Sequence, residues 1–430
     1  MSISHLLTSF LIGALSSALL AADVLVVRDD GGGDFVSLEA AVLAAQDGDV
    51  LLLHGDFATE TPTLIGKSLV FVAEAGERPI VGGLGISGIP QGGTVVVRGL
   101  SIGPKPERGP LPFMGSLAIG SSQGSILVED CVIEGLDGDP TSSSTTWGES
   151  AVAIGSSTGV VFTRCTMVGG DAATFEGSTL LVPVGKPGSG LEFDFSGVHV
   201  FASTVIGGAG AMRWNDFPGS DGAPGLRGSG RLLLEGGLVQ GGPGGTDCVV
   251  PGVGCGGGAG VVIEPGFFGS ESHMRRRGAL AQGGAGGQLA PPSTGTGDAG
   301  ADLDVDAVLI EFPGAPTFMV SEAPLRTGEH GSITVHGAPG ANVAWVMSLA
   351  LDANLLPGSK GVLVPDLPLL GPHLLGTIPP SGEVVFQFVN PSIARMGLDA
   401  LLIGKQALVL DGDGLRFGGP SGFVHLGTTP

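Results

Sequence analysis

The sequence predicts an all-β protein in which a parallel β-helix precedes a small β-sandwich, and three features of the chain support this prediction. Apolar residues recur at positions i, i+2, i+5 and i+7 in seven runs, which begin at Val95, Ile126, Val160, Val198, Leu232, Met274 and Leu303. Glycine-rich tracts separate these runs, as expected where loops leave one corner of a repeating coil. After Phe312 the spacing gives way to ordinary strand alternation.

The recurring spacing describes how each coil would line a core. Alternate side chains of a strand point to the same face, so residues i and i+2 point inward together. A short bend adds one residue, and residues i+5 and i+7 point inward from the next strand. Residues 23–313 are therefore expected to form the β-helix, and residues 314–430 a β-sandwich accessory domain.

Composition and charge limit the class of protein. The chain has 430 residues, of which 80 are Gly and 30 are Pro, but 42% are hydrophobic, so a core can be buried. We interpret the glycines as turns and loops of a solenoid rather than as disorder. The net charge of −22 argues against nucleic acid and anionic membrane surfaces as partners, because both require basic residues. It suits a soluble secreted protein.

Residues 1–22 are typical of a secretory signal peptide. Residues 6–20 are largely apolar and are followed by Ala21 and Ala22, after which the sequence becomes polar. The alternative is a retained N-terminal anchor. No later apolar run reaches the ~20 residues that a membrane-spanning helix needs, so no span is expected after signal cleavage. The predicted location is extracellular or at the cell surface.

The four cysteines fall into two pairs. Cys248 and Cys255 bracket a short loop that an oxidising compartment would close as a disulfide. Cys131 and Cys165 occupy the same column of consecutive coils, where strands lie ~4.8 Å apart with parallel Cβ vectors. A disulfide prefers a Cβ separation of ~3.8 Å, so this pair is expected to remain two stacked buried thiols.

The N-terminal segment combines a strand at 24–27, an amphipathic helix at 38–45 and a strand at 50–53, and the helix would cover the open end of a solenoid. Its sequence, VRDDGGGDFVSLEAAVLAAQDGDVLLLHG, resembles the opening segment of the pectin-lyase-like right-handed parallel β-helix superfamily. The resemblance implies a right-handed β-helix and selects no individual member. The C-terminal sequence GKQALVLDGDGLRFGGPSGFVHLG resembles sandwich domains of secreted proteins from environmental bacteria, which implies attachment or accessory binding.

The resemblance also implies where catalytic groups would lie. Polysaccharide lyases on this fold hold Ca²⁺ with carboxylates and abstract a proton with Arg or Lys, on the outer face of one parallel sheet. Outward positions of the last coils suggest catalytic candidates at Glu235, Arg275 and Arg277, and Ca²⁺ ligands at Asp304 and Asp306. The alternative is a surface charge ladder, in which each exposed pair contributes only ~0–1 kcal/mol.

Three other features raise questions for the structure. Arg276 falls at an inward position, so either its coil is broken and partly exposed or Arg276 has a buried carboxylate partner. The exposed pair Glu192 and Asp194 share one strand face and would suit a cation. Glycines recur at period three over 219–228, but four triplets predict a loop rather than a collagen helix.

The sequence therefore leaves three functions open. The first is a non-enzymatic secreted or cell-surface protein that acts in adhesion or glycan binding through its glycine-rich loops. The second is a polysaccharide lyase or related carbohydrate-active enzyme, and the third is a structural spacer of the cell envelope. The expected partner is an acidic or neutral polysaccharide or an envelope component, and Ca²⁺ is the one cofactor considered. Few aromatic residues are available to stack on sugar rings, among them Trp147 and Trp214.

Overall fold

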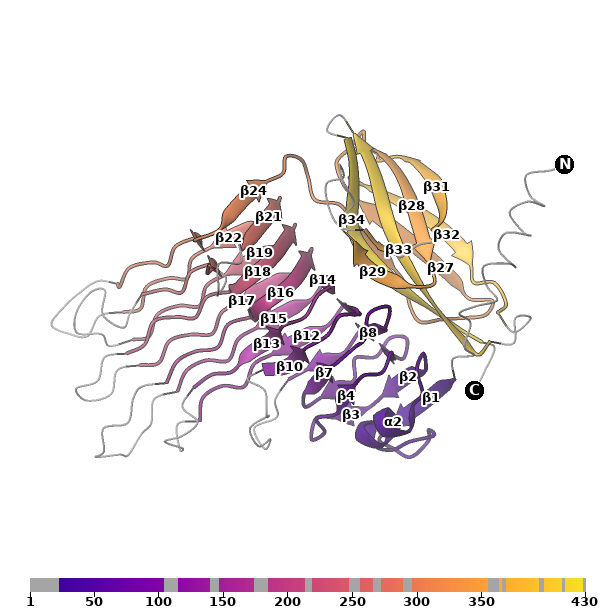
Figure 1. The fold of residues 1–430 in the computed structure, drawn as a ribbon, viewed down its shortest axis with the longest axis horizontal. Helices are drawn as coiled ribbons and strands as arrows, with labels where there is room; N and C mark the ends of the chain where they lie inside the picture. Colours follow the sequence, from indigo (N-terminus) through magenta and orange to yellow (C-terminus); the bar gives the residue numbers. More distant parts are fainter. Residues whose placement is uncertain are drawn as a thin grey trace.

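The computed structural model describes residues 23–103, 115–139, 147–173, 185–212, 219–246, 256–265, 272–288, 296–354, 363–365, 369–393, 398–411 and 414–427. These residues form strands almost throughout, which confirms the all-β class, with one helix among them. Two parts are visible, a parallel β-helix and a separate mixed-sheet domain (Figure 1). The expected signal peptide and the Cys248–Cys255 disulfide lie outside the described residues.

Three walls of parallel strands form the β-helix, and we call them the first, second and third sheets, although the first and second are one continuous sheet joined through the long strands β16 (Leu191–Phe201) and β18 (Leu226–Glu235). One complete coil supplies β10 (Gly115–Gly120), β11 (Ser125–Glu129) and β12 (Val132–Glu134) to the three walls in turn. The first sheet contains β4 (Thr63–Ile65), β7 (Leu84–Ser87), β10, β13 (Ser150–Gly155), the start of β16 (Leu191–Phe201), the start of β18 (Leu226–Glu235), β20 (Val261–Ile263) and β23 (Leu303–Val305). The second contains β1 (Val24–Arg28), β2 (Val50–His54), β5 (Val70–Ala73), β8 (Thr94–Arg98), β11, β14 (Val160–Thr163), the ends of β16 and β18, β21 (His273–Arg277) and β24 (Val308–Glu311). The third contains β3 (Asp56–Phe57), β6 (Ile80–Val81), β9 (Ser101–Ile102), β12, β15 (Thr166–Val168), β17 (Thr204–Ile206), β19 (Leu238–Gln240) and β22 (Leu280–Gln282).

The inward register predicted for the first six runs is confirmed. Their first residues stack in one column of the second sheet, and each is at most 2% exposed: Val95, Ile126, Val160, Val198, Leu232 and Met274. Cys131 and Cys165 are buried free thiols, as expected, and burial raises the pKa of Cys165 well above its ordinary value. The core of the solenoid is therefore a stack of aligned apolar side chains.

Helix α2 (Leu38–Ala44) covers the first coil, as predicted. The Ser37 side chain accepts a hydrogen bond from the Ala40 backbone N–H and caps the helix N-terminus. Leu38, Ala41 and Val42 are buried against the core, so the helix closes this end of the solenoid.

The seventh run departs from the prediction. Leu303 and Val305 belong to β23 of the first sheet, whereas β24 stacks on β21 of the second sheet, with Leu309 paired to Met274. Val308 and Ile310 therefore do not occupy the inward register. The same spacing fits two different corners of the coil. In the first six runs it spans the corner between the second and third sheets, whereas in the seventh it spans the corner between the first and second sheets.

The C-terminal part is a sandwich built from one mixed sheet that folds over a shared core. Its strands follow the order β31 (Leu370–Thr377), β28 (Asn342–Ser348), β33 (Ala400–Asp411), β34 (Gly414–Leu426), β25 (Phe318–Ser321), β27 (His330–His336) and β32 (Glu383–Val389). β26 (Leu325–Arg326) pairs with β34, and β29 (Leu351–Asn354) pairs with β30 (Leu363–Pro365). Met319 and Ile333 of one half meet Val343 and Trp345 of the other, which confirms the predicted sandwich.

The sandwich packs on the outer face of the second sheet, and this contact determines which surfaces remain open. Outward residues of that sheet, among them Val96, Leu127 and Val161, form one buried cluster with Val424 and Leu426 of the sandwich. The face on which the resemblance would place catalytic groups is therefore a buried interface between the two parts of the chain.

Candidate functional site

The structure places Glu235 and Arg277 on adjacent rungs of the second sheet, as the sequence predicted. Arg277 Nη1 donates to Glu235 Oε1 over 3.0 Å, and both side chains are 1% exposed. An ion pair so far from solvent differs from the surface ladder expected and from an open active site. Removing either side chain would leave the other as an unpaired buried charge, so this ion pair stabilises the structure only while both partners are present.

Residues 312–317 explain why this pair is buried. They cross over the end of the sheet on their way to the sandwich, and Phe312 places its ring 5.3 Å from the Arg277 guanidinium carbon. The Thr317 backbone N–H donates to Glu235 Oε1 over 3.2 Å. Burial raises the pKa of Glu235, opposed by the neighbouring charge of Arg277. No substrate reaches these groups unless the segment moves.

Arg276 matches neither outcome that the sequence left open, because its coil is regular and its carboxylate partner is exposed. Its strand is regular, so the coil is not broken, and its guanidinium forms an ion pair with Glu311 on the last rung. The side chain is nevertheless 23% exposed, because it lies at the open end of the solenoid. Arg275 shares a column with Leu233 and Ile310 instead of an acidic residue.

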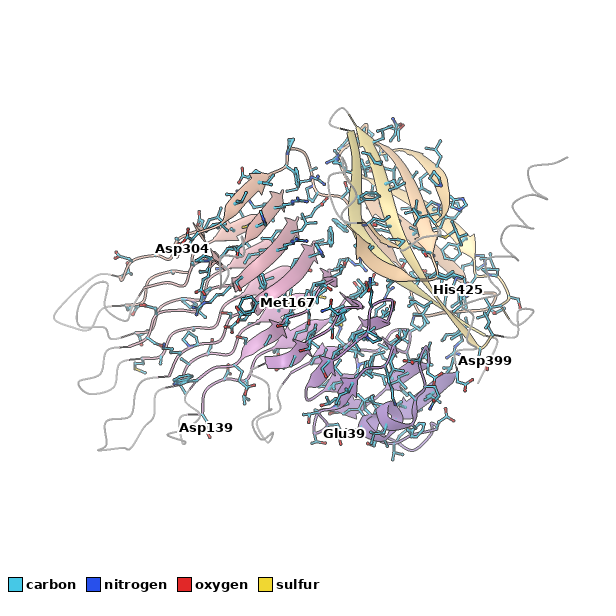
Figure 2. All side chains as sticks on the ribbon, in the orientation of Figure 1. Glu39, Asp139, Met167, Asp304, Asp399 and His425 are labelled. Carbon is cyan, nitrogen blue, oxygen red and sulfur yellow. The ribbon has the colours of Figure 1, made fainter. Side chains whose placement is uncertain are left out.

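Asp304 and Asp306 do not continue the column of Arg275 and Arg277. Asp304 pairs with Val262 on the first sheet, at the end of the β-helix and away from the sandwich (Figure 2). Asp306 follows it at the corner, where its N–H donates to the Ile263 carbonyl. Within the described residues, no group of three or more His, Cys, Asp or Glu side chains is placed to hold a metal ion. Asp304 and Asp306 are therefore not brought together with Arg275 and Arg277, and a Ca²⁺ site at these two residues stays a prediction.

Glu192 lies on the same sheet in a strip of charged side chains. It accepts a hydrogen bond from the Ser150 hydroxyl over 3.0 Å, and its strand partner on the next rung is Arg227. Arg227 forms an exposed ion pair with Glu264, which raises the pKa of the guanidinium. Asp194 likewise accepts from a serine hydroxyl, that of Ser229. Serine hydroxyls bind both carboxylates and Arg227 lies on the rung beside Glu192, which is typical of a solvated structural strip.

The strongest polar site, centred on Glu129, was missed by the sequence analysis. This side chain is fully buried between the β-helix and the sandwich. Its carboxylate accepts from the Ser421 hydroxyl over 2.5 Å and from the Gly422 backbone N–H over 2.7 Å. Arg98 and Arg164 approach it from neighbouring rungs as ion-pair partners.

The two arginines extend the contact into the sandwich. Arg98 donates to the carbonyls of Gly422 and Ser321, and Arg164 donates to the carbonyl of Met319. Because charged hydrogen bonds run in both directions across the interface, the two parts of the chain are held in one orientation. The chemistry of this site is structural.

The glycine-rich tracts form a second organised region, which we call the glycine slab. Outgoing arms at 135–139, 169–173, 207–212, 241–246 and 283–288 leave the third sheet, and returning arms at 147–149, 185–190, 219–225, 256–260 and 296–302 lead back to the first. The arms extend side by side from the β-helix, on the side away from the sandwich (Figure 1).

Backbone hydrogen bonds cross the slab in one continuous zigzag. After the first, each residue of the series donates its backbone N–H to the carbonyl of the residue before it, over an N···O distance of 2.7–3.0 Å. The series runs through Glu149, Gly170, Gly188, Gly208, Ala223, Gly242, Gly258, Gly284 and Gly300. The two layers of arms are therefore joined to each other by main-chain bonds rather than by an apolar core. Backbone groups that would otherwise be orphaned are satisfied in this way.

Glycine is required in the slab because of space rather than backbone conformation. A Cβ at Gly242 would lie 1.9 Å from the Gly208 carbonyl oxygen, and one at Gly258 would lie 1.9 Å from that of Ala223. Neither residue has a left-handed φ. The period-three glycines at 219–225 belong to a returning arm, so the expected loop is an ordered one. The period of three has the same cause as in collagen, where only Gly fits a crowded position that recurs every third residue.

Exposed side chains of the slab point outward from its two faces. On the returning face Trp147 is 51% exposed, and Lys186 and Asp221 follow it on the next two rungs. On the outgoing face Met212 is 47% exposed, while Asp171 uses its carboxylate to accept the Ala209 N–H. In the part of the slab that the structure describes, the surface is thus made mostly of small residues, and Trp147 adds a large aromatic ring to it. The second tryptophan, Trp214, lies outside the described residues.

Comparisons with known proteins add little to these observations. No family model matches the chain, and no curated protein matches it. Among solved structures, the chain is similar to the crystal structure of the enzymatically active domain of bacteriophage CBA120 tailspike protein 2, with 9% sequence identity and a TM-score of 0.25; the match covers 91% of this chain and 73% of that one. Within the described residues, no helix is long and apolar enough to span a membrane.

Proposed function

We propose that this chain is a secreted or cell-surface binding protein of the pectin-lyase-like β-helix type, without enzymatic activity, and that the returning face of the glycine slab binds a polysaccharide. The observation that carries the proposal is the exposed ring of Trp147 on a surface whose arms are joined by backbone hydrogen bonds. The outer face of the second sheet, where catalytic groups were expected, is instead closed by the sandwich.

The slab has the physical properties that glycan binding requires. A half-exposed indole offers an apolar face on which a sugar ring can stack, with little conformational entropy to lose. Lys186 and Asp221 lie one and two rungs away. Lys186 can donate hydrogen bonds beside the ring, and Asp221, whose Oδ1 already accepts the Gly256 N–H, can accept through Oδ2. Because the zigzag of main-chain bonds holds the arms, the surface is organised before the ligand arrives.

A glycan array and pull-downs with insoluble polysaccharides test the proposal. Retention by at least one polysaccharide is expected, and Trp147→Ala should weaken it about tenfold or more, the size of one lost stacking contact of ~1–3 kcal/mol. Phe195→Ala is the matched control, because Phe195 is 50% exposed but lies at a corner of the β-helix away from the slab. Equal losses in both variants would contradict the proposal.

The same preparations separate the other two functions. A lyase would release unsaturated products that absorb in the ultraviolet, and Arg277→Ala would abolish their release. An envelope spacer would bind no glycan and would remain with envelope fractions after cell breakage. Either result would replace the binding function proposed here.

A further inference from the structure

Strand β32 forms an open edge of the sandwich. It pairs with β27 without interruption over seven residues, from Val389 opposite His330 to Glu383 opposite His336. Among the described strands, none pairs with its other side. A long open edge is a template for pairing with another chain, and proteins usually protect such edges.

The backbone of β32 shows which residues face the open side. Gly337 donates to the Gly382 carbonyl and Asn390 donates to that of Glu329, so residues 382 and 390 direct their backbone groups toward β27. Backbone groups alternate along an antiparallel pair. The residues that turn their N–H and C=O groups outward are therefore Glu383, Val385, Gln387 and Val389.

The composition of this edge offers no protection against pairing. The strand has no Pro, Gly, Lys or Arg, and Val385, Phe386 and Val389 are 50%, 41% and 54% exposed. The opposite edge of the sheet differs: β31 contains Pro372, and its register against β28 shifts twice. Proline and bulges are devices that prevent edge pairing, and β32 lacks both.

We propose that β32 pairs antiparallel with β32 of a second copy of this chain, about a two-fold axis at Phe386. This register uses all four outward residues, because Val385 then lies opposite Gln387 of the second copy and Glu383 lies opposite Val389 of the second copy. Phe386 lies opposite itself in a non-hydrogen-bonded pair, where side chains are closest. Its exposed ring, already 5.6 Å from Trp345, is covered by the second ring.

Charge within the strand does not oppose a second copy in this register, although the chain is acidic. Glu383 is the one ionisable residue of the strand. The two-fold axis places the two Glu383 side chains at opposite ends of the pair, ~20 Å apart at ~3.3 Å per residue. That separation exceeds the Debye length of ~8 Å at physiological salt, so their repulsion is screened. In each chain, Glu383 Oε2 also lies 3.7 Å from Nδ1 of His336.

Sedimentation velocity of the full chain over a range of concentrations tests this pairing. A dimer is expected, and Gln387→Pro should raise its dissociation constant at least tenfold, because it removes an outward N–H and leaves the bonds to β27 intact. Gln387→Thr is the matched control and should remain dimeric. A wild-type chain that is monomeric throughout, or a dimer indifferent to Gln387→Pro, would overturn the proposal.

A cross-link gives a second test that does not depend on how well the proline variant folds. In the proposed register, cysteines at position 386 of the two copies lie about 4.5 Å apart at Cα, within disulfide range. Phe386→Cys should therefore form a covalent dimer on mild oxidation, whereas Leu374→Cys, on the opposite edge, and the wild type should not. Absence of the dimer in Phe386→Cys would contradict this register. The pairing is independent of what the slab binds.

Discussion

Glu129 Oε2 accepts a hydrogen bond from the backbone N–H of Gly422 over 2.7 Å, although the two residues are 293 positions apart in the chain. The bond joins the middle of the β-helix to the last strand of the sandwich. Because it is fully buried and accompanied by two arginines, it holds the sandwich over the second sheet. The position of this contact leaves the glycine slab as the open side of the molecule.

Replacing Glu129 by Gln should therefore weaken the attachment of the two parts. The amide cannot accept from both arginines and both sandwich donors, so the two buried arginines keep only the half-buried carboxylate of Asp130 as a charged partner. A loss of ~3–5 kcal/mol in the free energy of unfolding is expected, as for other broken buried pairs. Urea denaturation measures it, with Glu134→Gln as the control, since Glu134 is exposed on the next strand of the same coil. Equal urea midpoints for the two variants would refute this role.

The Glu235–Arg277 pair should behave as a coupled unit in a double-mutant cycle. Arg277→Met and Glu235→Leu alone each leave one buried charge unpaired and should cost ~3–5 kcal/mol, but the double variant should cost less than either. Arg227→Met removes the exposed pair with Glu264 and should cost less than ~1 kcal/mol. Additive losses at 235 and 277 would mean that the two side chains act separately.

The β-helix was predictable because its inward positions follow from strand geometry within each coil. The sequence also contained a signal for the interface that was not used. A strand buried on both faces forms a continuous apolar run, and residues 95–97, 126–128, 160–162 and 232–234 are such runs. The middle residue of each is covered by the sandwich.

The site residues were harder to predict because their partners depend on docking between distant parts of the chain. In the sequence, Glu129 does not differ from other acidic residues at outward positions, because its partner Gly422 lies 293 positions away. Asp304 was assigned to the wrong sheet, since one spacing fits two corners of the coil. The slab could have been anticipated from the period-three glycines at 219–225, had the crowding between neighbouring arms been considered.

The glycines of the slab should tolerate substitution according to the space around them. Gly242→Ala would place a methyl group 1.9 Å from a main-chain oxygen that is held in the zigzag, so the backbone must shift. A loss of ~1–3 kcal/mol is expected from such overpacking. Gly155→Ala is the control, because its Cβ would meet nothing within 4 Å and its φ is not left-handed. Thermal denaturation compares them, and equal melting temperatures would contradict the packing argument.

Lys405 is buried among aromatic rings of the sandwich core. Its side-chain nitrogen lies 3.5 Å from the ring centre of Phe423, 5.1 Å from that of Phe388 and 5.3 Å from that of Trp345. Burial, with a contribution from the charge of Arg98, lowers the pKa of Lys405 from 10.5 to about 7. The folded protein therefore releases this proton near neutral pH, whereas the unfolded chain retains it until about pH 10.

The stability of the protein should accordingly rise with pH between about 7 and 10. In that interval the unfolded state binds one proton more than the folded state at Lys405, so the free energy of unfolding increases with pH, whereas below pH 7 both states are protonated and the contribution is constant. Lys405→Met should remove this dependence and, at pH 7, stabilise the fold by ~1–3 kcal/mol, because a buried charge is replaced by an apolar chain of similar length. Urea denaturation at pH 7, 8.5 and 10 measures both effects, with the exposed Lys186→Met as the control. A Lys405→Met variant whose stability still rises with pH as steeply as the wild type would show that Lys405 is not the group responsible.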